Sequence, residues 1–292
     1  MNRKKNIAII GFGKLGSALF YELKSNGYIV NSIIEKNNVI YNKIIKIRGD
    51  VEVFKSINSC NLDKCDVLIL AVKDSQIEQL VREINEKGVN CKEKIVFHTS
   101  GAKSSNILKI KGLLEKNRGS FHPIQTFNAL SLINQGLLSG IFIGIEGGKE
   151  FIKFAKKLIK SLKSNLILIK AKDKEIYHLA SVVSSNLLAS YFSILEQISE
   201  KAGIPKSKIL KVYKPIVYKT IENIFSFGTA KALTGPFERG DTDTVKMHLS
   251  KIKKEKVFKD LYLILGKEAL DLARYKDSIT VKQKKEIERI LK

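Results

Sequence analysis

The sequence predicts an α/β fold, with a doubly wound, mostly parallel sheet in the first part of the chain and an all-helical second part. In residues 1–171, short apolar runs typical of buried parallel strands alternate with amphipathic helical stretches. After Lys172 the strand signals stop, and helical periodicity continues to the end of the chain. A glycine-rich turn separates the first apolar run from the first helix. We therefore expect two domains, residues 1–171 and residues 172–292.

Composition narrows the class of protein. With 292 residues and 44% hydrophobic side chains, the chain can bury a sizeable core. We find no apolar run long enough to span a bilayer, and the apolar stretch near the N-terminus is broken by glycines and by Lys14, unlike a signal peptide. The three cysteines are odd in number and lack metal-like spacing. We expect a cytoplasmic protein with no membrane segment and no metal site.

The net charge of +23 raises the question of nucleic-acid binding. The charge is mostly lysine, spread along the chain among many isoleucines and asparagines, and there are only seven arginines. No zinc finger, helix-turn-helix or aromatic RNA-binding motif accompanies it. We therefore expect no specific nucleic-acid partner, although a basic surface would attract an anionic cofactor or a carboxylate substrate.

The glycine-rich turn has the spacing of a dinucleotide-binding loop. An apolar strand at residues 7–10 is followed by Gly11, Gly13 and Gly16 as G-x-G-x-x-G, and then by a helix. Gly11 would permit the tight turn, Gly13 would let a pyrophosphate approach the backbone, and Gly16 would let the helix pack on the strand. The alternative is a tight turn that binds nothing. The predicted cofactor-binding residues of this Rossmann-type loop are Gly11, Phe12, Gly13, Lys14, Leu15 and Gly16.

The end of the second predicted strand reads Glu35, Lys36, Asn37. An acid there would hold the ribose 2′-hydroxyl of NAD, whereas a cation would accept the 2′-phosphate of NADP. The sequence offers both side by side, and Lys36 could also be one more solvated lysine. Because Lys36 and Asn37 together could hold a phosphate, we predict NADP(H) as the preferred cofactor, with NAD(H) as the alternative.

Three later strand ends are expected to surround one crevice. The first continues into Ala71 and Val72, the second ends in the residues 98–101 ("HTSG"), and the third carries His122. In open α/β sheets, ligands bind beyond the carboxyl ends of the strands. We therefore add Ala71, Val72 and Ser100 to the predicted cofactor-binding residues and place His98 and His122 at the crevice.

Residues 173–203 read as one long helix whose middle is almost wholly apolar or small, which predicts that it is buried. Its polar residues His178, Ser181, Ser185 and Asn186 fall within an arc of roughly 140° at 3.6 residues per turn. Polar groups on a buried helix need partners, which can be side chains, water or a ligand.

The stretch "ALTGPFERGD" forms a stiff corner in the helical part. Pro236 fixes its own φ and disfavours helix at Gly235. Arg239 is suited to a bidentate grip on a carboxylate or phosphate. Asp241 could either orient Arg239 or cap the next helix. A helix-capping loop with a surface Arg–Asp pair is the alternative.

Together the motifs carry a resemblance. The segments "GFGKLGSAL", "HTSGA", "FHPIQTF", "YHLASVVSSN" and "LTGPFERGD", in this order, are similar to bacterial proteins that join a Rossmann-like domain to a helical domain of unknown function 2520. These are distant relatives of pyrroline-5-carboxylate reductase and of the 6-phosphogluconate dehydrogenase superfamily. The resemblance covers nearly the whole chain and implies NADP binding, a homodimer through the helical domain and a site between domains. Two departures are Glu35 beside Lys36, and Lys73, where relatives commonly carry a proline. The positions that match motif residues expected to line the cleft are His98, Ser100, His122, Asn186, Arg239 and Asp241.

The resemblance also implies a reaction, the NADPH-dependent reduction of a small carboxylate-bearing carbonyl compound, with ketopantoate as the best candidate. In that reaction Arg239 would grip the carboxylate and Asn186 would polarise the ketone. Either His178 or His122 would protonate the alkoxide, because a histidine titrates near neutral pH. Better-known ketopantoate reductases use a lysine acid, for which we see no matching motif. The alternatives are an imine reductase of the pyrroline-5-carboxylate kind and a regulatory protein that binds NADP(H) without turnover.

Overall fold

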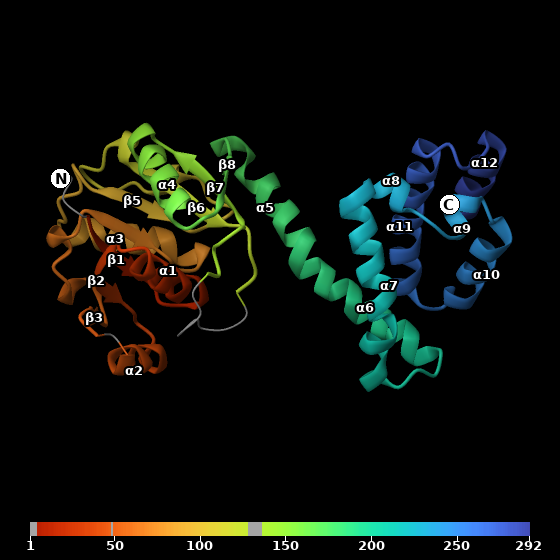
Figure 1. Cartoon of the computed structure of the whole chain (residues 1–292), viewed down its shortest axis with the longest axis horizontal. Helices are drawn as coiled ribbons and strands as arrows, with labels where there is room; N and C mark the ends of the chain where they lie inside the picture. Colours follow the sequence, from red (N-terminus) through yellow and green to blue (C-terminus); the bar gives the residue numbers. More distant parts are fainter. Residues whose placement is uncertain (1–4, 48, 128–135) are drawn as a thin grey trace. The chain divides into compact units, whose positions relative to one another are not determined.

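The computed structural model describes residues 5–47, 49–127 and 136–292 (Figure 1). These separate into two compact units, Met1–Asn186 and Leu187–Lys292. The predicted domain boundary after Ala171 stays a prediction. The structural division falls later because the first turns of the following helix pack against the sheet, as described below.

The first unit is built on one eight-stranded sheet with the strand order β3-β2-β1-β4-β5-β6-β7-β8. All neighbouring strands are parallel except β6 and β7, which are antiparallel. The predicted mostly parallel, doubly wound sheet is therefore confirmed. The strands are β1 (Asn6–Ile10), β2 (Ile29–Ile34), β3 (Glu52–Phe54), β4 (Val67–Leu70), β5 (Ile95–His98), β6 (Arg118–Pro123), β7 (Phe142–Gly147) and β8 (Asn165–Leu168).

Alternate residues of the central strands contribute to two apolar cores, one on each face of the sheet. On one face Ile7 and Ile9 of β1 pack with residues of the helices α1 (Lys14–Ser25) and α4 (Lys149–Ser161), and on the other Ala8 and Ile10 pack with residues of α3 (Ile77–Glu86). This two-sided burial explains why the strands read as near-continuous apolar runs. The helices of this unit are α1 (Lys14–Ser25), α2 (Asn38–Ile47), α3 (Ile77–Glu86), α4 (Lys149–Ser161) and α5 (Lys174–Val182). Short 3₁₀ turns are η1 (Ile57–Ser59), η2 (Leu62–Lys64), η3 (Asp74–Gln76), η4 (Ser105–Ile107), η5 (Glu115–Asn117) and η6 (Ala171–Asp173).

The second unit is helical, as predicted, with a small core around Val245, Leu270, Ile287 and Leu291. A π-helical turn, Val183–Leu187, joins α5 to the first helix of this unit. The π turn shifts the helical phase, so the 3.6-residue arc predicted for His178 and Asn186 does not hold across it. The helices are α6 (Leu188–Lys201), α7 (Lys206–Phe227), α8 (Thr229–Ala232), α9 (Pro236–Arg239), α10 (Thr242–Ile252), α11 (Lys256–Tyr275) and α12 (Val281–Ile290).

The predicted burial of the long connecting helix is wrong. Ile176 is 65% exposed and Leu179 is 51% exposed, and most of the α5 and α6 side chains that follow are also exposed. Apolar composition indicates that a surface will be covered, but it does not identify what covers it.

By length and composition alone, the helical stretch Ala171–Lys201 could also cross a membrane, with a mean hydropathy of 1.2 over its most apolar window. A helix that packs against other protein segments passes the same test, so the expectation of no membrane segment stays a prediction.

Candidate functional site

The three glycines of the turn after β1 have different surroundings. Gly11 has a φ of +95°, and a Cβ there would lie 2.5 Å from the carbonyl oxygen of Ala71. A Cβ on Gly16 would collide with the carbonyl oxygen of Gly11, so this glycine allows α1 to pack on the turn. A Cβ on Gly13 would meet nothing within 4 Å. Two glycines thus close the turn, and the third leaves open space in front of the N-terminus of α1, where backbone amides favour a phosphate.

A hollow of about 480 Å³ adjoins this turn. It is lined by Gly11 and Gly13, by the end of β2, by Ala71 and Val72, and by one side of α3. In the sheet, β1 lies between β2 and β4: the connection from β1 leads to β2 on one side, and the connection from β3 leads back to β4 on the other side. Such a switch point is where open α/β sheets bind ligands. The open space at Gly13 and this hollow fit a dinucleotide.

Glu35 is turned inward, where it braces the glycine-rich turn. Its side chain accepts hydrogen bonds from the backbone amides of Phe12 and Asn37, both at 2.7 Å, and it is only 8% exposed. Asn37 in turn accepts hydrogen bonds from the amides of Val39 and Ile40, so it caps α2. Glu35 and Asn37 are therefore engaged in local structure, and the predicted role of Asn37 and Lys36 in holding a phosphate stays a prediction.

Lys36 faces the hollow from the end of β2 and is held by Glu83 of α3. Its Nζ lies 2.8 Å and 2.9 Å from the two carboxylate oxygens of Glu83. The sequence suggested Glu35 as the acid that competes with Lys36, because the two are adjacent. In the structure the acid that pairs with Lys36 is Glu83, which is 47 residues away along the chain.

The remaining predicted residues of the turn differ in their burial and in their contacts. Phe12 is fully buried and packs edge-on against Phe20, so its side chain belongs to the core. Lys14 and Leu15 lie in the first turn of α1, with Lys14 exposed. Lys73 has a φ of −59°, a value that proline also holds, so the lysine leaves this loop in a proline-compatible conformation.

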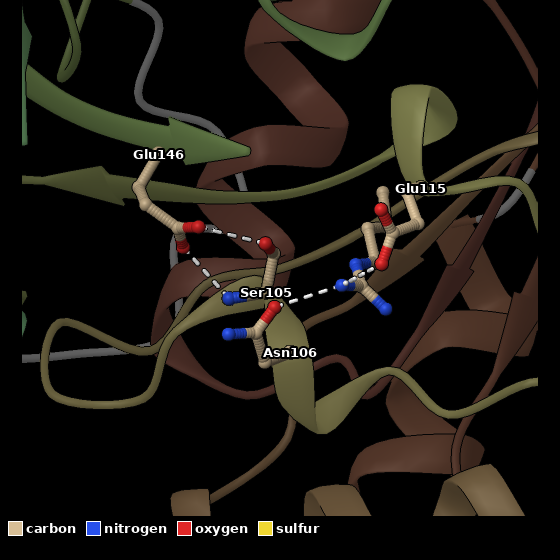
Figure 2. Close-up of polar contacts among 5 residues, drawn as sticks. Ser105, Asn106, Glu115 and Glu146 are labelled. Atoms are coloured by element: carbon tan, nitrogen blue, oxygen red, sulfur yellow. Dashed lines mark hydrogen bonds and ion pairs between the residues drawn. The ribbon is translucent and has the colours of Figure 1, made fainter. Parts of the chain in front are cut away.

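The loop after β5 is fixed by buried polar contacts. The Ser100 amide donates to Nδ1 of His98, and the Ser100 hydroxyl oxygen accepts from the Lys103 amide. Further along, Glu146 of β7 accepts from both the amide and the hydroxyl of Ser105, each at 2.7 Å (Figure 2). Both oxygens of a buried carboxylate are thereby satisfied, which holds the loop against the sheet.

The loop after β5 is also held by hydrogen bonds and an ion pair at its exposed side. Asn106 accepts a hydrogen bond from the Arg118 guanidinium, which also pairs with Glu115 (Figure 2). Arg118 begins β6, so the loop after β5 and the start of β6 are held together. The predicted role of Ser100 toward a cofactor stays a prediction, since its visible contacts are structural.

Two predicted histidines come together at this end of the sheet. The rings of His122, on β6, and His178, on α5, lie edge to face with their centroids 5.9 Å apart. Nδ1 of His122 lies 2.8 Å from the Tyr177 hydroxyl. A Cβ on Gly101 would lie 2.8 Å from Nε2 of His122 and would collide with the His178 ring. The glycine of the "HTSG" segment therefore makes room for both imidazoles.

Lys174 is a member of this cluster that the sequence did not reveal. It is 1% exposed, and its Nζ donates to the Ser120 hydroxyl at 2.6 Å and to the Ser100 carbonyl at 2.9 Å. Nothing in "AKDKE" separates this lysine from its exposed neighbours. Its burial follows from where α5 begins relative to β5 and β6.

Burial controls the charge state of the cluster. It lowers the pKa of His122 to about 4, with the Lys174 and His178 charges adding to the effect. Burial likewise lowers the pKa of His98 to about 4 and that of Lys174 to about 8. It raises the pKa of Tyr177 to about 12. At neutral pH His122 is therefore neutral, and it can donate or accept a hydrogen bond but is not an imidazolium acid.

The corner "ALTGPFERGD" is rigid in the second unit. Gly235 has a φ of +94°, and Pro236 begins α9 as predicted. Asp241 caps α10 by accepting from the amide and hydroxyl of Thr244, which decides between its two predicted roles. The Arg239 side chain is exposed, and its grip on a substrate stays a prediction.

The structure thus gathers some predicted residues and not others. The turn at Gly11 and the loop at Ala71 lie together, and His122 near the end of β6 lies beside His178 of α5. Asn186 lies in the π-helical turn, where its side chain accepts from the Ser185 hydroxyl. Its role toward a substrate stays a prediction.

Comparisons with known proteins agree with this architecture. A Rossmann-like domain model matches residues 2–116, and the model of the domain of unknown function 2520 matches residues 141–269. BF3122 from Bacteroides fragilis, to which an NADP oxidoreductase activity is ascribed, is 21% identical with a TM-score of 0.74, covering 92% of this chain and 98% of its own. TM1727 from Thermotoga maritima is also 21% identical with a TM-score of 0.74, covering 93% and 99%. The NADP-bound pyrroline carboxylate reductase of Plasmodium falciparum is 14% identical with a TM-score of 0.57, covering 92% and 98%.

At these identities the similarity to solved structures concerns the fold. No curated protein sequence matches the chain. The sheet order, the glycine-rich turn and the first family model define a Rossmann-type domain. The chain thus carries a Rossmann-like domain followed by a domain of unknown function 2520, as the order of its motifs predicted.

Proposed function

We propose that the protein is an NADPH-dependent oxidoreductase that reduces a small carboxylate-bearing compound at a C=N or C=O bond. The observation that carries the proposal is the pairing of His122 and His178 against Gly101 at the carboxyl ends of β5 and β6. These strands continue the row from β1 and β4, whose ends form the open glycine-rich turn. A polar cluster and a nucleotide-sized hollow on one sheet edge are what a hydride-transfer enzyme of this fold requires.

NADP(H) is the preferred cofactor in this proposal, and NAD(H) is a second one that the hollow can accept. Lys36 supports the preference because it is a cation at the end of β2. The Plasmodium pyrroline carboxylate reductase, which shares the fold, binds NADP in its crystal structure. When bound, the cofactor supplies the hydride.

The chain's own residues would position the substrate and its charge. If the Tyr177 hydroxyl donates to Nδ1 of His122, then Nε2 carries the proton and can donate to the substrate. His178 is the remaining candidate for the general acid. Arg239 would grip the carboxylate, and Asn186 would polarise the reacting bond.

The charge state of the cluster favours an imine as the substrate. An iminium carbon is already electrophilic and needs little proton donation, whereas a ketone needs an acid for the developing alkoxide. The pKa of His122, lowered to about 4, makes this ring a poor acid at neutral pH. We therefore rank a cyclic imine such as pyrroline-5-carboxylate first and ketopantoate, the substrate of the pantothenate pathway, second, with His178 as the acid in the latter case.

Assembly and location complete the proposal. The exposed apolar side chains of α5 and α6 support a homodimer in which this helix packs on a second copy. Cys60, Cys65 and Cys91 are buried unpaired thiols, which suits the reducing cytoplasm.

The test is NADPH oxidation by the purified protein with pyrroline-5-carboxylate and with ketopantoate in parallel assays, each repeated with NADH. Turnover of the imine alone supports the first ranking, and turnover of ketopantoate alone reverses it. If NADPH binds but neither substrate nor other small keto acids and imines are reduced, the enzyme proposal fails in favour of a protein that senses the nucleotide. Absence of nucleotide binding would contradict both the enzyme and the sensor.

A further inference from the structure

We propose that Glu83 sets the preference between NADP and NAD by competing with the 2′-phosphate for Lys36. This inference rests on the proposed function, because it requires that the hollow bind a dinucleotide. The observation behind it is the pairing of Lys36 with Glu83, with distances of 2.8 Å and 2.9 Å from Nζ of Lys36 to the two Glu83 oxygens. The only cation at the end of β2 among the described residues of the hollow is thus already paired.

Glu83 is held in place to do this. One turn earlier on α3, the Gln79 amide donates to Oε1 of Glu83 at 3.0 Å. The Glu83 side chain is 24% exposed and that of Lys36 is 56% exposed. The carboxylate is therefore the anchored partner, and the lysine is the one that can move toward a ligand.

The charges around the hollow balance, although the chain as a whole carries +23. Lys36 and Lys73 contribute two positive charges, and Glu35 and Glu83 contribute two negative charges. Glu35 is committed to backbone amides, so Glu83 is the acid whose carboxylate meets the lysine. The charged side chains that line the hollow therefore offer no net positive charge to a doubly charged phosphate.

The two cofactors would meet this pair differently. A 2′-phosphate beside Lys36 must displace Glu83 or sit next to a like charge, and both reduce its affinity. A ribose 2′-hydroxyl can donate to the Glu83 carboxylate instead, as it does to the acid of NAD-specific sites. Lys36 thus favours NADP, Glu83 favours NAD, and the wild-type preference is the difference between them.

The test is isothermal titration of the full-length protein with NADP⁺ and with NAD⁺. Glu83→Gln keeps the shape and the contact with Gln79 but removes the charge, so the Kd for NADP⁺ is expected to fall about tenfold while the Kd for NAD⁺ stays the same or rises. Lys36→Gln is expected to shift the ratio of the two Kd values in the opposite direction. Glu86→Gln is the matched control, since it removes the same charge from an exposed position on the same helix, and it is expected to change both Kd values less than about twofold.

Different failures have different meanings. If NADP⁺ binds to the parent protein and the ratio of Kd values is unchanged in Glu83→Gln, this inference is wrong and the proposed function stands. The inference is also wrong if Glu86→Gln shifts the ratio as much as Glu83→Gln, because the effect is then one of general charge. If the parent binds neither nucleotide, the proposed function and this inference fail together.

Discussion

Lys174 and Ser120 are joined by a buried hydrogen bond of 2.6 Å from the lysine Nζ to the serine hydroxyl. Because the same Nζ reaches the Ser100 carbonyl, one ammonium group links α5 to the ends of β5 and β6. The site is therefore organised around a charge that burial disfavours, since the pKa of Lys174 is lowered to about 8. A buried titratable group with a perturbed pKa in such a cluster is a candidate for function.

Replacing Lys174 with Met should change both the free energy of unfolding and the pKa of His122, which can be measured independently. The free energy of unfolding at pH 7 should rise by about 1–2 kcal/mol, because a disfavoured buried charge is removed and the chain length is kept. The pKa of His122 should rise, since the Lys174 charge is one cause of its depression. Urea unfolding and NMR titration of the ring would measure both, with Lys172→Met, at an exposed position, as the control.

The pH dependence of this variant provides a second check. In the parent, burial lowers the pKa of Lys174 from 10.5 in the unfolded chain to about 8 in the folded state. Between these values the unfolded state binds more protons, so this group makes stability rise with pH. That rise should be absent in Lys174→Met, and its persistence would contradict the assignment.

Acid should destabilise the protein through its buried histidines. The pKa values of His98 and His122 are lowered from 6.5 to about 4. As pH falls from 6.5 to 4, these histidines bind protons in the unfolded state but not in the folded state. The free energy of unfolding therefore falls, by up to about 3 kcal/mol per histidine. Urea unfolding at intervals over this range should show a shallower slope for His98→Asn than for the parent. Identical slopes would place the acid sensitivity elsewhere.

The fold was predictable because its signals are local. The alternation of apolar strands and amphipathic helices and the spacing of Gly11, Gly13 and Gly16 each lie within a short window of sequence. The strand order brought the ends of β4, β5 and β6 together as expected from parallel topology. The capping role of Asp241 was one of two local options, and the structure selected it.

What could not be predicted depends on contacts between distant residues. Glu83 meets Lys36 across 47 positions, and Lys174 meets Ser100 across 74, and no pattern near either residue marks it. Glu35 had the right position for a ribose ligand, yet its carboxylate accepts a hydrogen bond from a backbone amide of the glycine-rich turn. The burial predicted for α5 and α6 was wrong because apolar composition is equally consistent with a surface that another chain covers.

The glycine-rich turn offers a matched pair of variants. Gly13→Ala should leave the free energy of unfolding within about 0.5 kcal/mol, because the new Cβ meets open space at an extended backbone with a φ of −67°. Its Kd for NADP⁺ should rise by about tenfold or more, since the methyl group occupies the approach to the α1 amides. Gly16→Ala should instead destabilise the protein by about 3 kcal/mol or prevent folding. Thermal melts would measure the stability of both variants, and titration would measure their Kd for NADP⁺. Normal NADP⁺ binding by Gly13→Ala would argue against a cofactor at this turn.

Gly101→Ala should damage catalysis and spare the cofactor. The added Cβ would press on Nε2 of His122 and on the His178 ring, and both rings can move because they are side-chain ends. A displacement of about 1 Å should lower kcat by about a hundredfold. The Kd for NADP⁺ should stay within about twofold of the parent value, because the hollow lies at β1 and β4. An unchanged kcat would show that the histidine pair does not take part in the reaction.

Arg239→Lys tests how the substrate is held. The corner that carries Arg239 is fixed by a turn at Gly235, by an ion pair of 2.9 Å between Lys276 and Glu238, and by the cap at Asp241. An exposed side chain on so rigid a corner can be changed without loss of the fold. Lysine keeps the charge but loses the bidentate fork, so KM for the carboxylate substrate should rise by about tenfold. Steady-state kinetics would give KM, and titration would show whether NADP⁺ binding is unchanged. If cofactor affinity fell instead, Arg239 would belong to the phosphate site, and the carboxylate would need another partner.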